Sequence, residues 1–107
     1  MNTLMLETFI NDGVVPDGPA DAEEFKEARH QGWITYNGHY IITNKGSFFV
    51  IREIVERWWT TLGIEGRPYS SSVRHVGGGK FVGHVIHEGA YTAQAFTVNG
   101  KGEILPC

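Results

Sequence analysis

The sequence contains little cysteine, no long hydrophobic run and no basic leader. Cys107 is the only cysteine among 107 residues, so no disulfide forms within the chain, and we expect a reducing environment. The longest uninterrupted apolar run, Phe48–Ile51, is much shorter than the roughly 20 residues that cross a membrane. Residues 1–10 contain no Lys or Arg and include Glu7, which argues against a signal peptide. We therefore expect a cytoplasmic protein that does not contact a membrane.

Positive charge is also scarce in the first third of the chain. The formal net charge of the whole chain is −3. Residues 1–31 hold seven acidic and two basic residues, whereas residues 32–107 hold five acidic and seven basic residues. Nucleic-acid binders usually present a basic face, because contacts to phosphates supply much of their affinity. The acidic first third therefore favours a protein partner over DNA.

The composition that is present is typical of a folded domain. Hydrophobic residues make up 41% of the chain and charged residues 20%. A chain of this length has room for one core, so we expect residues 1–107 to form a single domain. Apolar periodicity predicts two short helices, Thr3–Asn11 and Ala22–Gln31. Asp21 and Glu24 have the spacing of a capping box at the start of the second helix.

The middle of the sequence predicts a β-hairpin followed by a long helix. Two β-prone runs, Trp33–Tyr36 and Tyr40–Thr43, flank Asn37-Gly38, a dipeptide that readily adopts positive φ in a tight turn. Thr43 or Asn44 then precedes an amphipathic helix over Ser47–Leu62. The apolar seam of this helix follows steps of three and four residues: Phe48, Ile51, Val55, Trp58 and Leu62. We also expect an ion pair one turn apart, between Glu53 and Arg57.

The last third predicts a loop and two more strands. Residues from Glu65 to Lys80 are rich in Gly, Ser and basic side chains and predict a loop. Strands are expected at Phe81–His87 and Ala90–Val98, joined by a turn at Glu88-Gly89, with another turn at Asn99-Gly100.

The expected fold class is α+β: two short helices, a β-hairpin, one long amphipathic helix and a C-terminal antiparallel β-hairpin. We expect the long helix to cover one antiparallel sheet to which both hairpins contribute. The apolar face of that sheet is predicted to contain Val82, Ile86, Phe96 and Val98.

Residues 24–46 resemble the second half of a winged helix-turn-helix domain. The matching residues are Gly32-Trp33-Ile34, where the hairpin begins, and Tyr40-Ile41-Ile42-Thr43-Asn44-Lys45-Gly46, where it ends. The resemblance implies a DNA-binding fold in which the hairpin is the wing and Ala22–Gln31 occupies the position of the recognition helix. The sequence departs from the family in having two helices before the wing instead of three.

A second departure concerns charge on the helix in the recognition position. Its acidic residues outnumber its lysine and arginine, whereas a helix that enters the major groove favours Arg, Lys, Asn and Gln. The acidic residues are Glu23, Glu24 and Glu27, and the basic ones are Lys26 and Arg29. The fold resemblance therefore does not by itself imply DNA binding.

Three groups of residues have the atom types of a catalytic or metal site without its arrangement. His84 and His87 have a His-x-x-His spacing, but residues three apart on a strand point to opposite faces. Ser70–Ser72 lie near His75 without a strand-turn-helix elbow. Gly77–Lys80 lacks the hydroxyl residue and the following helix of a phosphate-binding loop. We therefore expect no catalytic residue, no metal and no cofactor.

Trp58 and Trp59 are adjacent, and adjacent helical residues point about 100° apart, so both cannot face one core. One alternative is that a tryptophan covers the C-terminal sheet. The other is that one or both lie at an interface, either with a partner or in a homodimer through the 47–62 helix.

Two main functional hypotheses follow. The first is a non-catalytic protein-binding module, an adaptor or an inhibitor that masks a protein target, of the kind found among accessory proteins of phages and mobile elements. Its expected contact residues are Glu23, Glu24, Glu27, Trp58 and Trp59.

The alternative is a winged-helix DNA-binding transcriptional regulator. Its expected contact residues are Lys26, Arg29, His30, Lys45, Arg67, Arg74 and Lys80. A third hypothesis is a small enzyme that acts through His84, His87 or Ser72.

Overall fold

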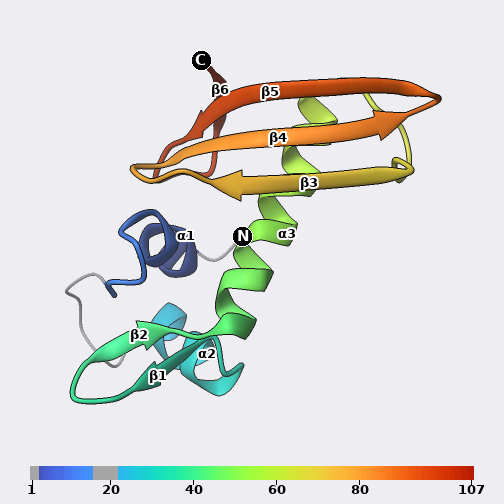
Figure 1. Ribbon diagram of the computed structural model, residues 1–107. Helices are drawn as coiled ribbons and strands as arrows, with labels where there is room; N and C mark the ends of the chain where they lie inside the picture. Colours follow the sequence, from blue (N-terminus) through green and yellow to red (C-terminus); the bar gives the residue numbers. More distant parts are fainter. Residues whose placement is uncertain (1–2, 16–21) are drawn as a thin grey trace. The chain divides into compact units, whose positions relative to one another are not determined.

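A computed structural model describes residues 3–15 and 22–107 and shows an α+β fold, as predicted (Figure 1). The elements, in chain order, are α1 (Thr3–Ile10), α2 (Glu23–His30), β1 (Ile34–Tyr36), β2 (Tyr40–Ile42), α3 (Asn44–Thr61), β3 (Ser70–His75), β4 (Lys80–His87), β5 (Ala90–Val98) and β6 (Ile104–Pro106). Among these residues, β1 pairs with β2, and a separate antiparallel sheet has the order β3-β4-β5-β6.

The chain divides into two compact units, residues 1–50 and residues 51–107. Helix α3 begins in the first unit and ends in the second. Each unit therefore has its own part of α3 and its own sheet.

In the first unit, two short helices supply most of the buried apolar side chains. These are Met5 and Leu6 of α1 and Phe25 and Ala28 of α2. Both helices lie within one residue of their predicted bounds. Asp21 of the predicted capping box lies outside the described residues, and the N-cap residue Ala22 makes no side-chain hydrogen bond.

The predicted β-hairpin of the first unit is confirmed. Tyr36 lies opposite Tyr40, and Gly38 adopts a φ of 78° in the connection. Positive φ is accessible to glycine without a steric penalty, which explains why the chain turns there. Val14 forms an isolated bridge with Ile41, so β2 lies between Val14 and β1.

Thr43 determines where α3 begins. Its Oγ1 accepts a hydrogen bond from the N–H of Gly46 at 3.1 Å, which makes it the N-cap. The same hydroxyl donates toward the carbonyl oxygens of Gly32 and Trp33, 2.7 and 2.9 Å away. A Cβ at Gly46 would overlap the Trp33 carbonyl oxygen, so only glycine fits this close approach. The helix starts at Asn44, three residues earlier than predicted.

The buried face of α3 differs from the predicted seam. Val50, Ile54 and Trp58 follow one another at one-turn intervals and are fully buried, whereas Phe48 is 73% exposed. The other seam residues are buried or half-buried: Val55, Ile51 and Leu62. Apolar residues occur on several sides of this helix, so its periodicity is compatible with more than one buried face, and tertiary packing decides which face is covered.

Arg57 is not paired with Glu53, contrary to the prediction. Its Nη1 donates a hydrogen bond to the carbonyl oxygen of Gly102 at 2.8 Å, which ties α3 to the connection between β5 and β6. An ion pair joins Arg52 and Glu56 at 3.8 Å instead. Both of its side chains are exposed, so solvent screens the attraction and the pair adds little stability.

Two predictions about the larger sheet are wrong. Residues 65–80 are not a continuous loop, because Ser70–His75 form strand β3 beside β4. Alternate residues of β3 are exposed, as in a strand with one covered face. The sequence does not show this alternation, because three consecutive serines occupy both faces and have no apolar periodicity. The β1–β2 hairpin belongs to a different sheet. The 18-residue helix between the hairpin and β3 is about 27 Å long, so the strands at its two ends pair locally.

Both predicted turns of the C-terminal region are present. The β4–β5 turn has positive φ at Glu88-Gly89, with values of 52° and 79°. After β5, the side-chain oxygen of Asn99 accepts hydrogen bonds from the backbone N–H groups of Lys101 and Glu103 at 2.9 and 3.0 Å. This side-chain cap stabilises the turn that brings β6 back beside β5.

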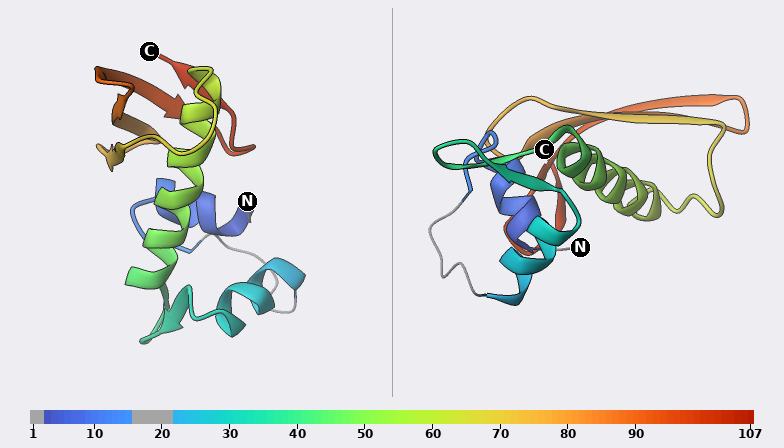
Figure 2. Two further views of the ribbon diagram at one scale, coloured as in Figure 1. Left: turned by 90° about the vertical axis from the view of Figure 1, so that its right-hand side faces the viewer. Right: turned by 90° about the horizontal axis from the view of Figure 1, so that it is seen from below.

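Trp58 is the contact between α3 and the β3–β6 sheet, and α3 lies on one side of that sheet (Figure 2). Its Nε1 donates a hydrogen bond to the side-chain oxygen of Gln94 at 2.8 Å. Its ring stacks on Phe96 with the centroids 5.6 Å apart. Gly83 lies beneath the indole, where a side chain would collide with it.

The face of β4 that packs against α3 is opposite to the predicted one. Phe81, Gly83 and Val85 are buried, whereas Val82 is half-buried and Ile86 is 37% exposed. Because side chains alternate along a strand, a shift of one residue exchanges the two faces. The predicted burial on β5 is confirmed, since Phe96 and Val98 are buried.

Replacing Gly83 by alanine is expected to lower the free energy of unfolding by about 1–3 kcal/mol, because the new Cβ would lie 2.8 Å from three carbons of the Trp58 ring. Urea denaturation followed by circular dichroism measures the loss. Ala93→Val is the control, since Ala93 is exposed on β5 and the change should shift stability by less than about 0.5 kcal/mol. Equal stability of the two variants would contradict the placement of Trp58.

Candidate functional site

The face of the β3–β6 sheet opposite Trp58 is the candidate site, and we name it the open face. The register of the four strands determines its members, because alternate residues and their cross-strand partners share a face. They are Ser70, Ser72, Arg74, Lys80, Val82, His84, Ile86, Tyr91, Ala93, Ala95, Thr97 and Leu105.

Large apolar side chains of the open face are exposed to solvent. Tyr91 is 64% exposed, Leu105 47% and Ile86 37%. Ile86 and Tyr91 are direct cross-strand partners, so two of these side chains are adjacent. Contiguous exposed apolar side chains are typical of a surface that another molecule covers.

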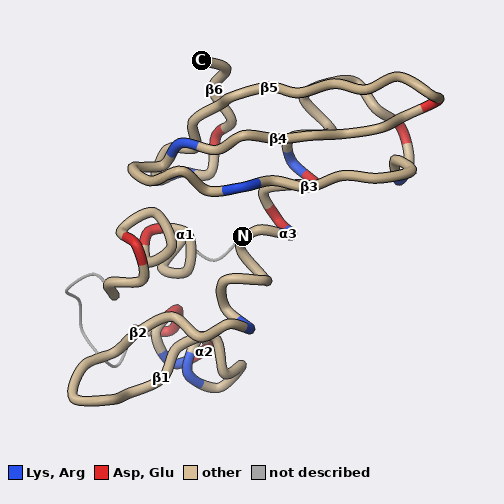
Figure 3. Tube along the Cα trace, in the orientation of Figure 1, with Lys and Arg blue, Asp and Glu red and all other residues tan. Residues whose placement is uncertain are grey.

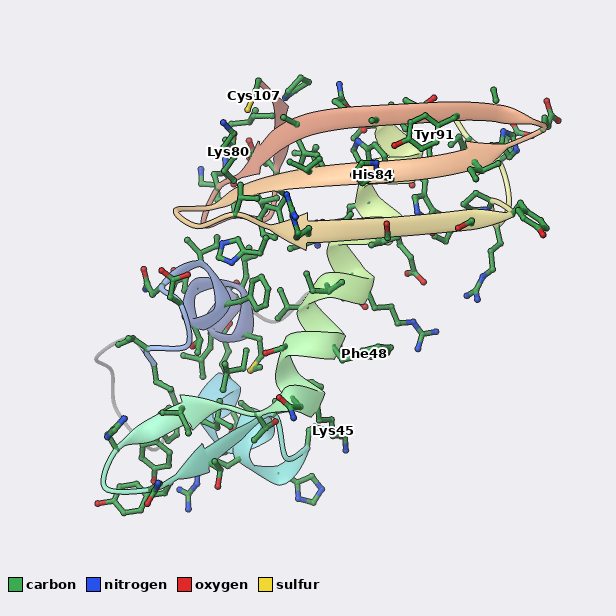
Figure 4. All side chains as sticks on the ribbon, in the orientation of Figure 1. Lys45, Phe48, Lys80, His84, Tyr91 and Cys107 are labelled. Atoms are coloured by element: carbon green, nitrogen blue, oxygen red, sulfur yellow. The ribbon has the colours of Figure 1, made fainter. Side chains whose placement is uncertain are left out.

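A hydrogen bond orients the tyrosine of the open face. The hydroxyl of Tyr91 lies 2.5 Å from Nδ1 of His84, and the two ring centroids are 5.9 Å apart (Figure 4). These residues are diagonal neighbours on the two central strands, which places both rings near the middle of the sheet. The contact reduces the rotamer freedom of Tyr91, so a partner would meet a pre-organised aromatic ring.

The open face is positively charged at one end. None of the four strands contains Asp or Glu (Figure 3). Arg74 lies opposite Val82, which makes it a diagonal neighbour of Lys80 two residues earlier on β4. Both cations are exposed, and the sheet supplies no carboxylate to neutralise them.

The structure corrects one predicted contact residue. Trp58 is fully buried between α3 and the sheet, so its indole is not available to a partner. Trp59 is half-buried, and its Nε1 is buried without a hydrogen-bond partner in the part of the chain that the structure describes. On α3, Phe48 is the exposed large apolar residue that a homodimer through this helix would use.

The charged residues of α2 lie on two flanks of the helix. Phe25 and Ala28 point inward, and the remaining positions follow the helical period of about 100° per residue. One flank is basic and consists of Lys26, Arg29 and His30; the other is acidic and consists of Glu23, Glu24 and Glu27. All six side chains are exposed.

The basic flank of α2 borders a shallow hollow of about 390 Å³. Lys26, Arg29 and His30 line it, and the guanidinium of Arg29 lies 5.6 Å from the centre of the Tyr40 ring. The side chain of Lys45 lies close to Gly32, just beyond the end of α2. The structure therefore brings four of the predicted DNA-contact residues together in the first unit.

The other predicted basic contacts belong to the second unit. Arg74 and Lys80 lie on the open face, and Arg67 is exposed before β3. The glycines that precede Lys80 form the turn between β3 and β4, where the N–H of Val76 donates to the Lys80 carbonyl oxygen at 2.9 Å. The predicted basic loop is therefore largely a β-hairpin.

The predicted divergence of the two histidines of β4 is confirmed. His84 lies on the open face and His87 on the other side of the sheet, because three residues separate them. Ser72 lies opposite His84, whereas His75 is on the Trp58 side. Among the residues described, no group of three or more His, Cys, Asp or Glu side chains could hold a metal ion.

Ser72, His84 and Tyr91 form a row across the sheet that superficially resembles a hydrolytic triad. No hydrogen bond joins Ser72 to His84 among the described residues, although the two are cross-strand partners. Acyl transfer also needs N–H donors that point at the reacting oxygen, and the N–H groups of paired strands point along the sheet. Within this row, the hydrogen bond between His84 and Tyr91 orients the aromatic ring.

The sequence contains one signal that identifies the open face. Between Glu65 and Glu103, the only acidic residue is Glu88, at the β4–β5 turn. The sequence pattern assigns Ile86 to the covered face of β4 and predicts no strand at β6, so Ile86 and Leu105 are absent from the predicted contacts. Tyr91 lies on the predicted strand β5, and its exposure follows from alternation with the buried Phe96 and Val98.

Comparison with models of protein families, with curated proteins and with solved structures yields no significant match. The winged-helix resemblance therefore rests on the hairpin residues alone. Within the described part of the chain, no helix has both the length and the apolar character needed to cross a membrane.

Val85 and Ile86 are neighbours on β4 that test which face is covered. Val85→Ala is expected to lower the free energy of unfolding by about 2 kcal/mol, because Val85 is 2% exposed. Ile86→Ala should cost less than about 1 kcal/mol, although it removes more atoms. Urea denaturation of both variants provides the measurement, and a greater loss from Ile86→Ala would refute the assignment of the open face.

Proposed function

We propose that this protein is a non-catalytic protein-binding module and that the open face is its contact surface. The observation that carries the proposal is the set of exposed apolar side chains on a sheet face that the second unit leaves uncovered: the adjacent pair Ile86 and Tyr91, and Leu105 at the other end of the face. Burying them against a partner would remove apolar surface from water, which is the main driving force of protein association.

The chemistry of the open face favours a protein over a nucleic acid. Its exposed apolar side chains include the aliphatic Ile86 and Leu105, which offer neither a stacking surface nor a phosphate contact. Only Arg74 and Lys80 are cationic. A mixture of aromatic, aliphatic and arginine side chains is typical of the core of a protein–protein interface.

A photo-crosslinking experiment tests the open face. p-Benzoylphenylalanine in place of Tyr91 should cross-link to one partner in a lysate of the organism of origin. An added Ile86→Glu change should abolish the cross-link, because it places an unpaired carboxylate in the interface. The control carries the same photo-reactive residue at Lys101, which is exposed outside the open face. Equal cross-linking from both positions, or a cross-link that survives Ile86→Glu, would contradict the proposal.

A second candidate function is DNA binding by the first unit, as the winged-helix resemblance implies. The observation that favours it is the gathering of Lys26, Arg29 and His30 along one flank of α2, away from the acidic flank. Lys45 adds a third cation, after Lys26 and Arg29, near the end of the same helix. Together these side chains would contact phosphates, whose neutralisation releases counterions.

Electrophoretic mobility shifts at two salt concentrations test this second function. Duplex DNA should bind at low salt, and Lys26→Ala should lower the slope of log affinity against log salt by about 1, as expected for one lost phosphate contact. Glu24→Ala, on the acidic flank, is the control and should not reduce the slope. A lack of any shift at low salt would rule out this function.

A further inference from the structure

The open face also specifies what kind of partner it accepts. We propose that it binds an amphipathic α-helix that carries acidic residues beside its apolar stripe. This inference rests on the proposed protein-binding function and adds to it the secondary structure and the charge of the partner. Three properties of the open face support this inference: its backbone groups are hydrogen-bonded within the sheet, its side chains differ in size along the face, and its charge is positive.

The backbone of the open face leaves an incoming strand without hydrogen-bond partners. β4 and β5 are the central strands, and their N–H and C=O groups point along the sheet toward neighbouring strands. An extended peptide lying on this face would bury its own polar backbone unpaired, which costs free energy. A helix satisfies its backbone hydrogen bonds internally, so only its side chains need partners.

The surface shape of the open face is complementary to the apolar stripe of a helix. Ile86 and Tyr91 form a raised pair at one end of the face, and the hydrogen bond to His84 orients the tyrosine. Ala93 and Ala95 are the next residues of β5 on this face, and their small side chains leave a shallow area beside the raised pair. Apolar side chains at positions i, i+3 or i+4, and i+7 of the partner helix would pack on this shallow area and beside the raised pair.

The charge of the open face selects carboxylates in the partner. Arg74 and Lys80 are neighbours at the end of the face away from Ile86 and Tyr91 (Figure 4). Since none of the four strands contains a carboxylate, covering these cations with an uncharged or basic surface would leave them unpaired. Acidic residues beside the apolar stripe of the helix would pair with them and set its orientation.

A second copy of this chain fits the open face less well. Two open faces packed together would bring Arg74 and Lys80 against a surface that has no acidic residue. The acidic helix α2 of another copy lacks an exposed apolar stripe, because Phe25 and Ala28 are buried within its own unit. These two surfaces of a second copy therefore do not supply the acidic apolar helix, and the proposed partner is a different protein.

Two synthetic helical peptides test the inference with the full-length protein. Both have 18 residues and the same leucine stripe, and their outward positions carry Glu in one peptide and Lys in the other. Fluorescence anisotropy should show that the Glu peptide binds at least about tenfold more tightly than the Lys peptide, with an advantage that shrinks as salt is added. The double change Arg74→Glu and Lys80→Glu should reverse the preference.

Matched controls separate charge on the open face from charge elsewhere. Lys101→Glu changes an exposed cation outside the face and should leave the tenfold preference intact. Circular dichroism of each variant verifies that it is folded, and Arg74 and Lys80 are both exposed, so their replacement should not disturb the core. Equal affinity for the two peptides, or no reversal in the double variant, would overturn the inference.

The failure of this inference is distinguishable from the failure of the proposed function. If the photo-reactive residue at position 91 captures its partner but the Glu peptide does not bind, the open face binds protein and the helical acidic partner is wrong. If no specific cross-link forms, the protein-binding function is wrong as well. Tight binding of a single-stranded oligothymidine that depends on Arg74 and Lys80, in place of the Glu peptide, would overturn both.

Discussion

The packing of Trp58 on Gly83 is the interaction on which the second unit depends. The indole is fully buried and stacks on Phe96, and its Nε1 donates a hydrogen bond to the side-chain oxygen of Gln94 at 2.8 Å. Such an approach requires a strand residue without a side chain directly beneath the ring, and Gly83 provides it in the centre of β4. Because this contact attaches α3 to one side of the sheet, it also determines which side stays uncovered.

The open face follows from that one-sided arrangement. With α3 on the Trp58 side, alternation along β4 and β5 sends Ile86 and Tyr91 to the other side, where the second unit has no helix to cover them. The same alternation brings Arg74 and Lys80 to that side without any carboxylate. The sheet therefore joins an apolar surface to a localised positive charge, the two features from which we infer an acidic helical partner.

Helix α3 was predictable from the sequence, but its buried face was not. The helix was expected from its apolar spacing, with Thr43 or Asn44 before it, and the structure shows that Thr43 is the N-cap. The seam that included Phe48 also met the helical period, yet Phe48 is 73% exposed. The helical period alone cannot distinguish between overlapping apolar stripes, because tertiary packing decides which stripe is buried.

Local signals in the sequence were sufficient to predict the α+β class, the three turns at Asn37-Gly38, Glu88-Gly89 and Asn99-Gly100, and the three helices, because turn dipeptides and helical periods act over a few residues. The sequence also determined the absence of carboxylates from the four strands. Two features were not predictable from local signals: that Ser70–His75 form a strand, and that the covered face of β4 is the one containing Gly83. Both features depend on pairing with residues distant in the chain, and a strand accepts either face until a partner such as Trp58 covers one of them.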